Sequence, residues 1–169
     1  MSTPETEAIA RNLCGHLRQM TQWGREIPSE KFDWAFSPPA PTARILITHA
    51  YQWLVCDRQH VEQPDAAKHP RVPDAPQDQQ ALCDALLEET DRWQEMILSL
   101  TPEQLGEVRH QFNDPSDWSV RGILHHMYQN CVYKHGQLSY IYFALGLDGD
   151  APYDAPFPNP IYEEVFGEK

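Results

Sequence analysis

The chain has 169 residues and a hydrophobic content of 41%, which is enough for one domain with a substantial core. Its formal net charge is −12 and its sequence has no cluster of Lys and Arg, so we expect neither a nucleic-acid surface nor an anionic-membrane surface. The N-terminus lacks a signal-peptide pattern, and no apolar run is long enough to span a bilayer, so a cytoplasmic protein is expected.

Apolar residues recur at helical spacings of three and four in four long segments, which are residues 4–24, 42–61, 78–100 and 118–146. A capping-box pattern predicts a short additional helical turn at 101–108, and no strand pattern of convincing length is found. We therefore predict an all-α four-helix bundle over residues 1–146. Its three connections are long, so loop length leaves the helix topology open.

The last segment, residues 147–169, contains four prolines and four aromatic residues. Proline breaks helix, but the aromatic residues argue against full disorder. We predict that this tail packs on the bundle or on a partner subunit. A homodimer is expected, with the tail or the first and fourth helices at its interface. The cysteines Cys14, Cys56, Cys83 and Cys131 all fall in predicted helices, which favours buried free thiols.

One residue of the fourth helix departs from its apolar pattern. If Met127 marks the centre of the buried face, rotation of about 100° per residue places Lys134 roughly 20° from that centre. Asn130 then lies on the shoulder of the face and His126 at its edge. A lysine there is costly unless a partner or a cavity receives it. It either snorkels or pairs with a buried carboxylate such as Asp57, or it lies in a polar pocket and binds an anionic ligand.

The second helix offers His49 on the shoulder of its face and Trp53 within the predicted buried stripe. Bundle cores build sites from side chains on facing helices, so His49, Asn130 and Lys134 together predict a ligand site. The alternative is that His49 is a hydrogen-bonded histidine in the core or at its margin.

A metal site has one chelating pair available on the fourth helix. Cys131 and His135 are four residues apart, and with one ligand from the second helix they could hold zinc. The alternative for Cys131 is a plain core residue in the apolar stripe.

Two stretches resemble the DinB/YfiT-like superfamily of small four-helix bundles. ARILITHAYQWLV is similar to the second helix of that family, with its histidine at His49. WSVRGILHHMYQNCVYKHGQLSYIYFALG is similar to the fourth helix, whose pattern resembles HxxxHxxxHxGQ followed by an apolar stretch and Gly. The residues that fit this pattern are His126, Gly136, Gln137 and Gly146.

The resemblance implies a divalent metal, zinc or nickel, held by His49 and by two histidines one turn apart on the fourth helix. Those two positions are Asn130 and Lys134 here. An ammonium repels a cation, and an asparagine amide is a weak ligand for zinc or nickel, so this metal site is degenerate.

Three hypotheses follow from the resemblance. The first is a small-molecule-binding protein, or a transferase or hydrolase related to thiol-dependent S-transferases, whose pocket comprises His49, Trp53, His126, Asn130 and Lys134. Its ligand would be small and anionic. The second is a non-catalytic dimeric bundle whose former metal site is structural. The third is a metalloenzyme that uses His49 with a non-standard ligand set, either His126 or the Cys131–His135 pair.

Overall fold

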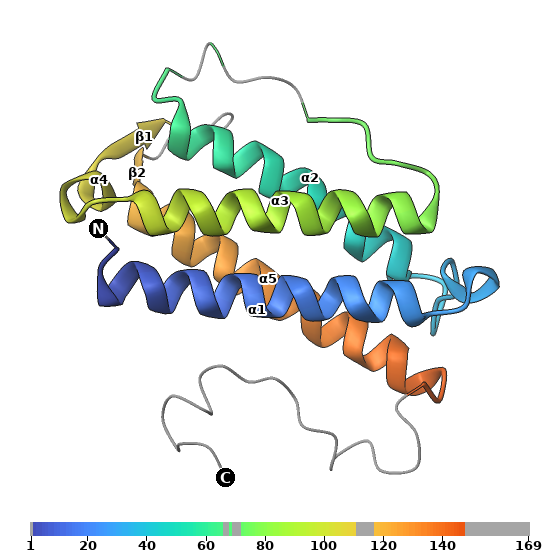
Figure 1. Cartoon of the computed structure of the whole chain (residues 1–169). Coiled ribbons are helices and arrows are strands. Elements are labelled where there is room, and N and C mark those ends of the chain that lie inside the picture. Colours follow the sequence, from blue (N-terminus) through green and yellow to red (C-terminus); the bar gives the residue numbers. More distant parts are fainter. Residues whose placement is uncertain (1, 66–67, 69–71, 111–116, 148–169) are drawn as a thin grey trace, which may run out of the picture.

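The computed structural model describes residues 2–65, 68, 72–110 and 117–147 (Figure 1). Its elements, in chain order, are α1 (Pro4–Glu26), a 3-10 turn (Ser29–Lys31), α2 (Ala43–Glu62), α3 (Gln79–Ser99), α4 (Pro102–Gly106), β1 (Val108–His110), β2 (Asp117–Ser119) and α5 (Val120–Ala144). The four long helices confirm the predicted all-α four-helix bundle, with ends within two residues of those expected. Within the described residues, no helix combines the length and hydropathy that crossing a bilayer requires.

The helices start and stop where their capping residues place them. The side chains of Thr3, Thr42, Asp78 and Ser119 each accept a hydrogen bond from the backbone N–H three residues later. Helix α5 ends at Ala144, and two residues later Gly146 has a φ of 70°, a left-handed conformation that glycine adopts without steric cost. The N–H of Gly146 donates to the carbonyl of Phe143 at 2.9 Å, and that of Leu147 donates to the carbonyl of Tyr142 at 3.3 Å. This is a Schellman cap, and it turns the chain away from the helix axis.

The four long helices are arranged as up, down, down and up. Figure 1 shows α1 and α5 running in one direction and α2 and α3 in the other, so α2 and α3 are parallel although they follow one another in the chain. Helix α1 packs mainly against α3 and α5, and α2 packs against the same two helices. Helices α2 and α5, which supply the residues of the predicted site, therefore pack against each other.

The core runs along the centre of the bundle and draws on all four long helices. Leu13, Leu17 and Met20 form the buried stripe of α1. Trp93 of α3 is fully buried, and its indole N–H donates to the carbonyl of Leu54 on α2 at 2.8 Å. Phe32, from the connection between α1 and α2, is also buried in this core.

Two short strands precede α5, although the sequence predicted none of convincing length. They pair antiparallel, with Arg109 opposite Trp118. Each has three residues, which is too short to show the two-residue alternation that identifies a strand. The pair fixes the entry of the chain into α5, since the N–H of Val120 then donates to the carbonyl of Glu107 at 2.9 Å.

The prediction that Trp53 belongs to the buried stripe of α2 is wrong. Its side chain is 46% exposed, because the buried stripe runs through Leu46, Ala50 and Leu54 and is centred about one residue away. All four cysteines are free, and three are buried, whereas Cys56 is only half-buried. The predicted packing of the tail lies outside the described residues from position 148 onward and stays a prediction.

Candidate functional site

Lys134 lies on the buried face of α5, as its position in the sequence predicted. The residue is only 5% exposed and shares this face with Met127, Cys131 and Leu138. Its ammonium donates one hydrogen bond, to Oδ1 of Asn130 one helical turn earlier, at 3.3 Å. An ammonium has three N–H donors, so two of them are not used by the residues that the structure describes.

Among the residues that the structure describes, no carboxylate is paired with Lys134. In the part of the chain that is described, Lys134 forms no ion pair within 4.0 Å. Asp57, which the sequence offered as a partner, is buried on α2 and contacts Nδ1 of His60 at 3.3 Å instead. Burial lowers the pKa of Lys134, while the negative charges of Cys131, when ionised, and of Asp57 oppose that shift. The predicted internal ion pair is therefore not formed, and the ammonium is left with an amide as its neighbour.

Asn130 connects Lys134 to His126 along the same helix. The amide Nδ2 of Asn130 lies 2.9 Å from Nε2 of His126 and also donates to the His126 carbonyl at 3.2 Å. The imidazole of His126 in turn lies edge-on to Trp118, with ring centroids 5.2 Å apart. Because the amide nitrogen is used by His126, the amide oxygen of Asn130 is directed to the ammonium. Three successive turns of α5 thus carry a connected polar row.

His49 on α2 lies across from this row. Partial burial of its ring lowers the pKa of His49, and the positive charge of Lys134 lowers that pKa further. His49 is exposed rather than on the shoulder of the core, and its Nε2 accepts a hydrogen bond from the indole N–H of Trp53 one turn later. The structure thus brings Asn130 and Lys134 into contact on α5, whereas the exposed His49 of α2 makes its side-chain hydrogen bond with Trp53.

The residues at this place do not fit a metal ion. The Nε2 lone pair of His49 is already used by Trp53, and Lys134 would present a positive charge to any cation. Across the described ranges, no group of three or more His, Cys, Asp or Glu side chains is placed to hold a metal ion. The three family ligand positions thus contain one histidine, one amide and one ammonium.

The alternative ligand set, His49 with Cys131 and His135, is not assembled either. The ring of His135 stacks on Trp23 of α1, with centroids 4.7 Å apart, and contacts His16 edge-on at 4.8 Å. It therefore faces α1, on the other side of α5 from α2. Burial raises the pKa of the Cys131 thiol to about 12, so Cys131 stays protonated and behaves as the core residue of the alternative interpretation.

Comparison with solved structures identifies the fold. A DinB-like protein from Bacillus subtilis, YjoA, is 16% identical and superposes with a TM-score of 0.68, covering 82% of this chain and 92% of that one. The chain has a DinB/YfiT-like fold. YfiT from Bacillus subtilis, described as a probable metal-dependent hydrolase with an unusual four-helix bundle topology, is 11% identical. It has a TM-score of 0.65, with coverage of 86% of this chain and 90% of that one.

No protein-family model and no curated protein sequence matches this chain. At identities of 16% and 11%, the two solved structures show the fold alone. The chemistry of this DinB/YfiT-like bundle is therefore inferred from its own side chains.

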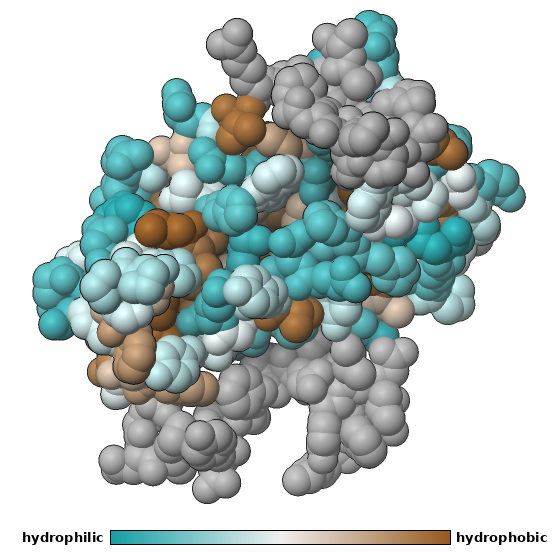
Figure 2. Space-filling view, turned by 180° about the vertical axis from the view of Figure 1, so that it is seen from behind, coloured by the Kyte–Doolittle hydropathy of each residue, from teal (hydrophilic) through white to brown (hydrophobic). Residues whose placement is uncertain are grey.

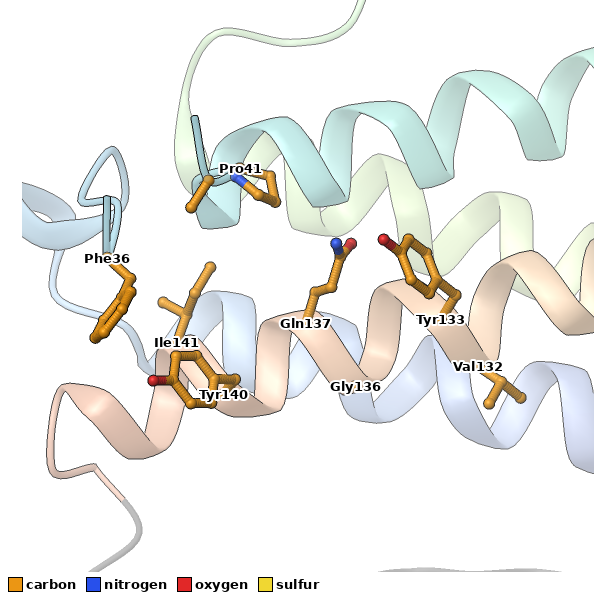
Figure 3. A pocket seen from close by; sticks show the side chains of 9 residues that line it. Phe36, Pro41, Val132, Tyr133, Gly136, Gln137, Tyr140 and Ile141 are labelled. Atoms are coloured by element: carbon orange, nitrogen blue, oxygen red, sulfur yellow. The ribbon is translucent and has the colours of Figure 1, made fainter. Parts of the chain in front are cut away.

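The sequence did not indicate a second feature of this DinB/YfiT-like bundle, an apolar groove beside the C-terminal half of α5. The groove has a volume of about 500 Å³, and its walls include Phe36, Pro41, Tyr133, Gln137, Tyr140 and Ile141. Figure 3 shows the rings of Phe36 and Tyr140 close together at one end and Gln137 directed toward α2. Figure 2 shows the side of the molecule on which α2 and α5 lie, where brown apolar residues interrupt the polar surface. Periodicity could not reveal the groove because Phe36 and Pro41 come from an irregular connection.

Proposed function

We propose that this chain binds a small anionic molecule between α2 and α5, with the Lys134 ammonium holding its anionic group. The observation that carries the proposal is a buried lysine without a counter-ion among the described residues. A buried charge without a partner destabilises the fold, whereas a bound anion would supply the missing partner. A small carboxylate or thiol-carboxylate matches this requirement best, since each carries one compact anionic group.

The neighbours of Lys134 support an anion rather than a cation. Asn130 holds the ammonium by one hydrogen bond, which leaves two N–H donors for the oxygens of a carboxylate. His49 of α2 has a lowered pKa, so its imidazole is mainly neutral near pH 7 and Lys134 supplies the positive charge. In place of a metal ion, the site would thus use a fixed ammonium as its positive charge.

The same arrangement suits the transferase or hydrolase hypothesis in one respect. In a reacting ligand, a fixed ammonium would stabilise negative charge that develops on an oxygen or a sulfur atom. YfiT is described as a probable metal-dependent hydrolase. A related reaction in this chain would need Lys134 to provide that electrostatic stabilisation, and we propose no step that passes through a metal ion.

Thermal melting tests the proposal. The wild-type protein and Lys134→Met are melted with acetate, mercaptoacetate and inorganic phosphate, and with neutral acetamide as the control ligand. A ligand present at ten times its Kd contributes about 1.4 kcal/mol, which raises the Tm of a chain this size by about 3 °C or more. We expect a carboxylate to raise the Tm of the wild type and not that of Lys134→Met.

A matched variant controls for loss of charge. Lys68→Met also removes one positive charge, but Lys68 is exposed on the surface. It should retain the full response to carboxylates. If no anion raises the wild-type Tm, or if Lys134→Met responds as the wild type does, the proposal is wrong.

A further inference from the structure

Several exposed aromatic side chains lie together in the groove beside α5. Phe36 and Tyr140 form a perpendicular ring pair with centroids 5.4 Å apart, and Tyr133 extends the same wall one to two turns earlier on α5. All three side chains are exposed, and Tyr140 is 54% exposed. A contiguous apolar hollow of this kind generally marks a surface that another segment covers. We call this hollow the Phe36–Tyr140 groove.

The chain leaves α5 next to this groove. Tyr140 lies seven residues before Leu147, which is about 10 Å along the helix axis. The Schellman cap at Gly146 turns the backbone away from the axis of α5, and Leu147 packs against the core. Leu147, the last residue that the structure describes, thus follows the groove-lining end of α5 after a turn away from the helix axis.

The segment that follows has the composition that an aromatic groove accommodates. Residues 152–160 read PYDAPFPNP, with four prolines around Tyr153 and Phe157. Proline-rich segments favour an extended polyproline II conformation and dock into aromatic-lined grooves, because little conformational entropy is lost on binding. Tyr153 comes six positions after Leu147, and that length of chain can span up to about 20 Å. The segment is therefore long enough to reach the groove of its own chain.

We propose that residues 152–160 occupy the Phe36–Tyr140 groove of the same chain, with prolines and aromatic rings packed against Tyr140 and Phe36. The connection through Leu147 makes the contact intramolecular, and short tethers give effective concentrations in the millimolar range. A contact that would be weak between separate molecules would then be formed in most copies of the chain. The segment would also cover apolar surface between the connection before α2 and the C-terminal half of α5.

Photo-crosslinking of the full chain tests this contact. The photoreactive residue p-benzoylphenylalanine replaces Tyr140 in one protein and Val108 in a control protein. Val108 is 55% exposed, like Tyr140, but belongs to β1 at the opposite end of the bundle (Figure 1). Each protein is prepared with natural and with 15N-labelled nitrogen, the two preparations are mixed, and cross-linked peptides are identified by mass spectrometry.

We expect cross-links from position 140 to residues 148–169 within one isotopic copy, at a yield several times that from position 108. Replacing both Tyr153 and Phe157 by Ser should lower the yield from position 140. Absence of these cross-links, an equal yield from position 108, or a yield unchanged by the two Ser substitutions would overturn the proposal. Links that join only labelled to unlabelled copies would overturn it as well, because a second chain would then occupy the groove.

Discussion

The ammonium of Lys134 donates its hydrogen bond to the amide oxygen of Asn130, 3.3 Å away and one turn earlier on α5. These two residues occupy the positions at which the family pattern implies histidines. An amide and an ammonium on successive turns form a donor-rich site, whereas two histidines would form an acceptor-rich one. Two histidines at these positions would favour a cation, whereas Asn130 and Lys134 favour an anion. For this reason we propose an anionic ligand.

The first prediction concerns the stability of Lys134→Met. Because no carboxylate is paired with Lys134 among the described residues, its removal leaves no buried carboxylate without a partner. The methionine chain suits the apolar stripe of α5, so the free energy of unfolding should change by less than about 1 kcal/mol or should increase. Urea denaturation measures this directly. A loss of about 3 kcal/mol or more would instead indicate a broken buried ion pair.

The second prediction concerns metal content. Protein purified without a His tag should carry much less than one equivalent of zinc or nickel, because His49 is the only histidine at the three family ligand positions. Elemental analysis by mass spectrometry checks this, with His49→Ala as the comparison. One full equivalent of tightly held metal in the wild type that is lost in His49→Ala would contradict the prediction.

The third prediction concerns acid stability. Burial, with a smaller effect of His16, lowers the pKa of His135 from 6.5 to about 4. The folded pKa lies below the unfolded one, so the neutral ring contributes stability above pH 6.5 that is lost as the pH falls toward 4. The full loss is at most about 3 kcal/mol.

A matched variant isolates this effect. His135→Phe keeps an aromatic ring on Trp23 but cannot be protonated. The free energy of unfolding is measured for the wild type and this variant by denaturation from pH 7 to pH 4. As the pH falls, the wild type should lose stability relative to the variant. The contribution of the carboxylates cancels in that difference. A difference that does not change with pH would show that His135 does not titrate in this range.

The sequence predicted the bundle well because its helices carry strong local signals. The apolar residues of each long helix recur at spacings of three and four, as those of α1 do, so the helices can be recognised without knowledge of distant contacts. Lys134 was placed correctly for the same reason, since its rotation on α5 depends only on its distance from Met127. Local pattern therefore gave both the architecture and the central residue of the candidate site.

The features that the sequence missed depend on contacts between distant segments. Trp53 could belong to the stripe of α2 by spacing, and only the packing of α2 against the other helices decides that Leu54 is buried and Trp53 is exposed. The sequence could not show whether Asp57 pairs with Lys134 either, because the two residues lie on different helices. The distance between them depends on how α2 and α5 pack. The Phe36–Tyr140 groove likewise joins an irregular connection to a helix.

The fourth prediction concerns self-association. A homodimer is expected from the sequence, with the tail or the first and fourth long helices, α1 and α5, at its interface, and Val132 of α5 is 40% exposed. Sedimentation should therefore show a dimer at about tens of micromolar, the range of weak specific interfaces. Val132→Glu should shift the protein toward monomer if α5 forms the interface. A wild-type monomer throughout that concentration range would contradict the expectation.

The most direct test of the account observes the Lys134 ammonium itself. NMR of 15N-labelled lysine side chains, assigned with Lys134→Met, should give an Nζ signal for Lys134 that shifts saturably as acetate or mercaptoacetate is added at constant pH and ionic strength. The signals of exposed lysines such as Lys68 should remain unchanged under the same conditions. A saturable shift confined to Lys134 is the result we predict, and a Lys134 signal that does not respond to any carboxylate would contradict the proposal that it holds an anion.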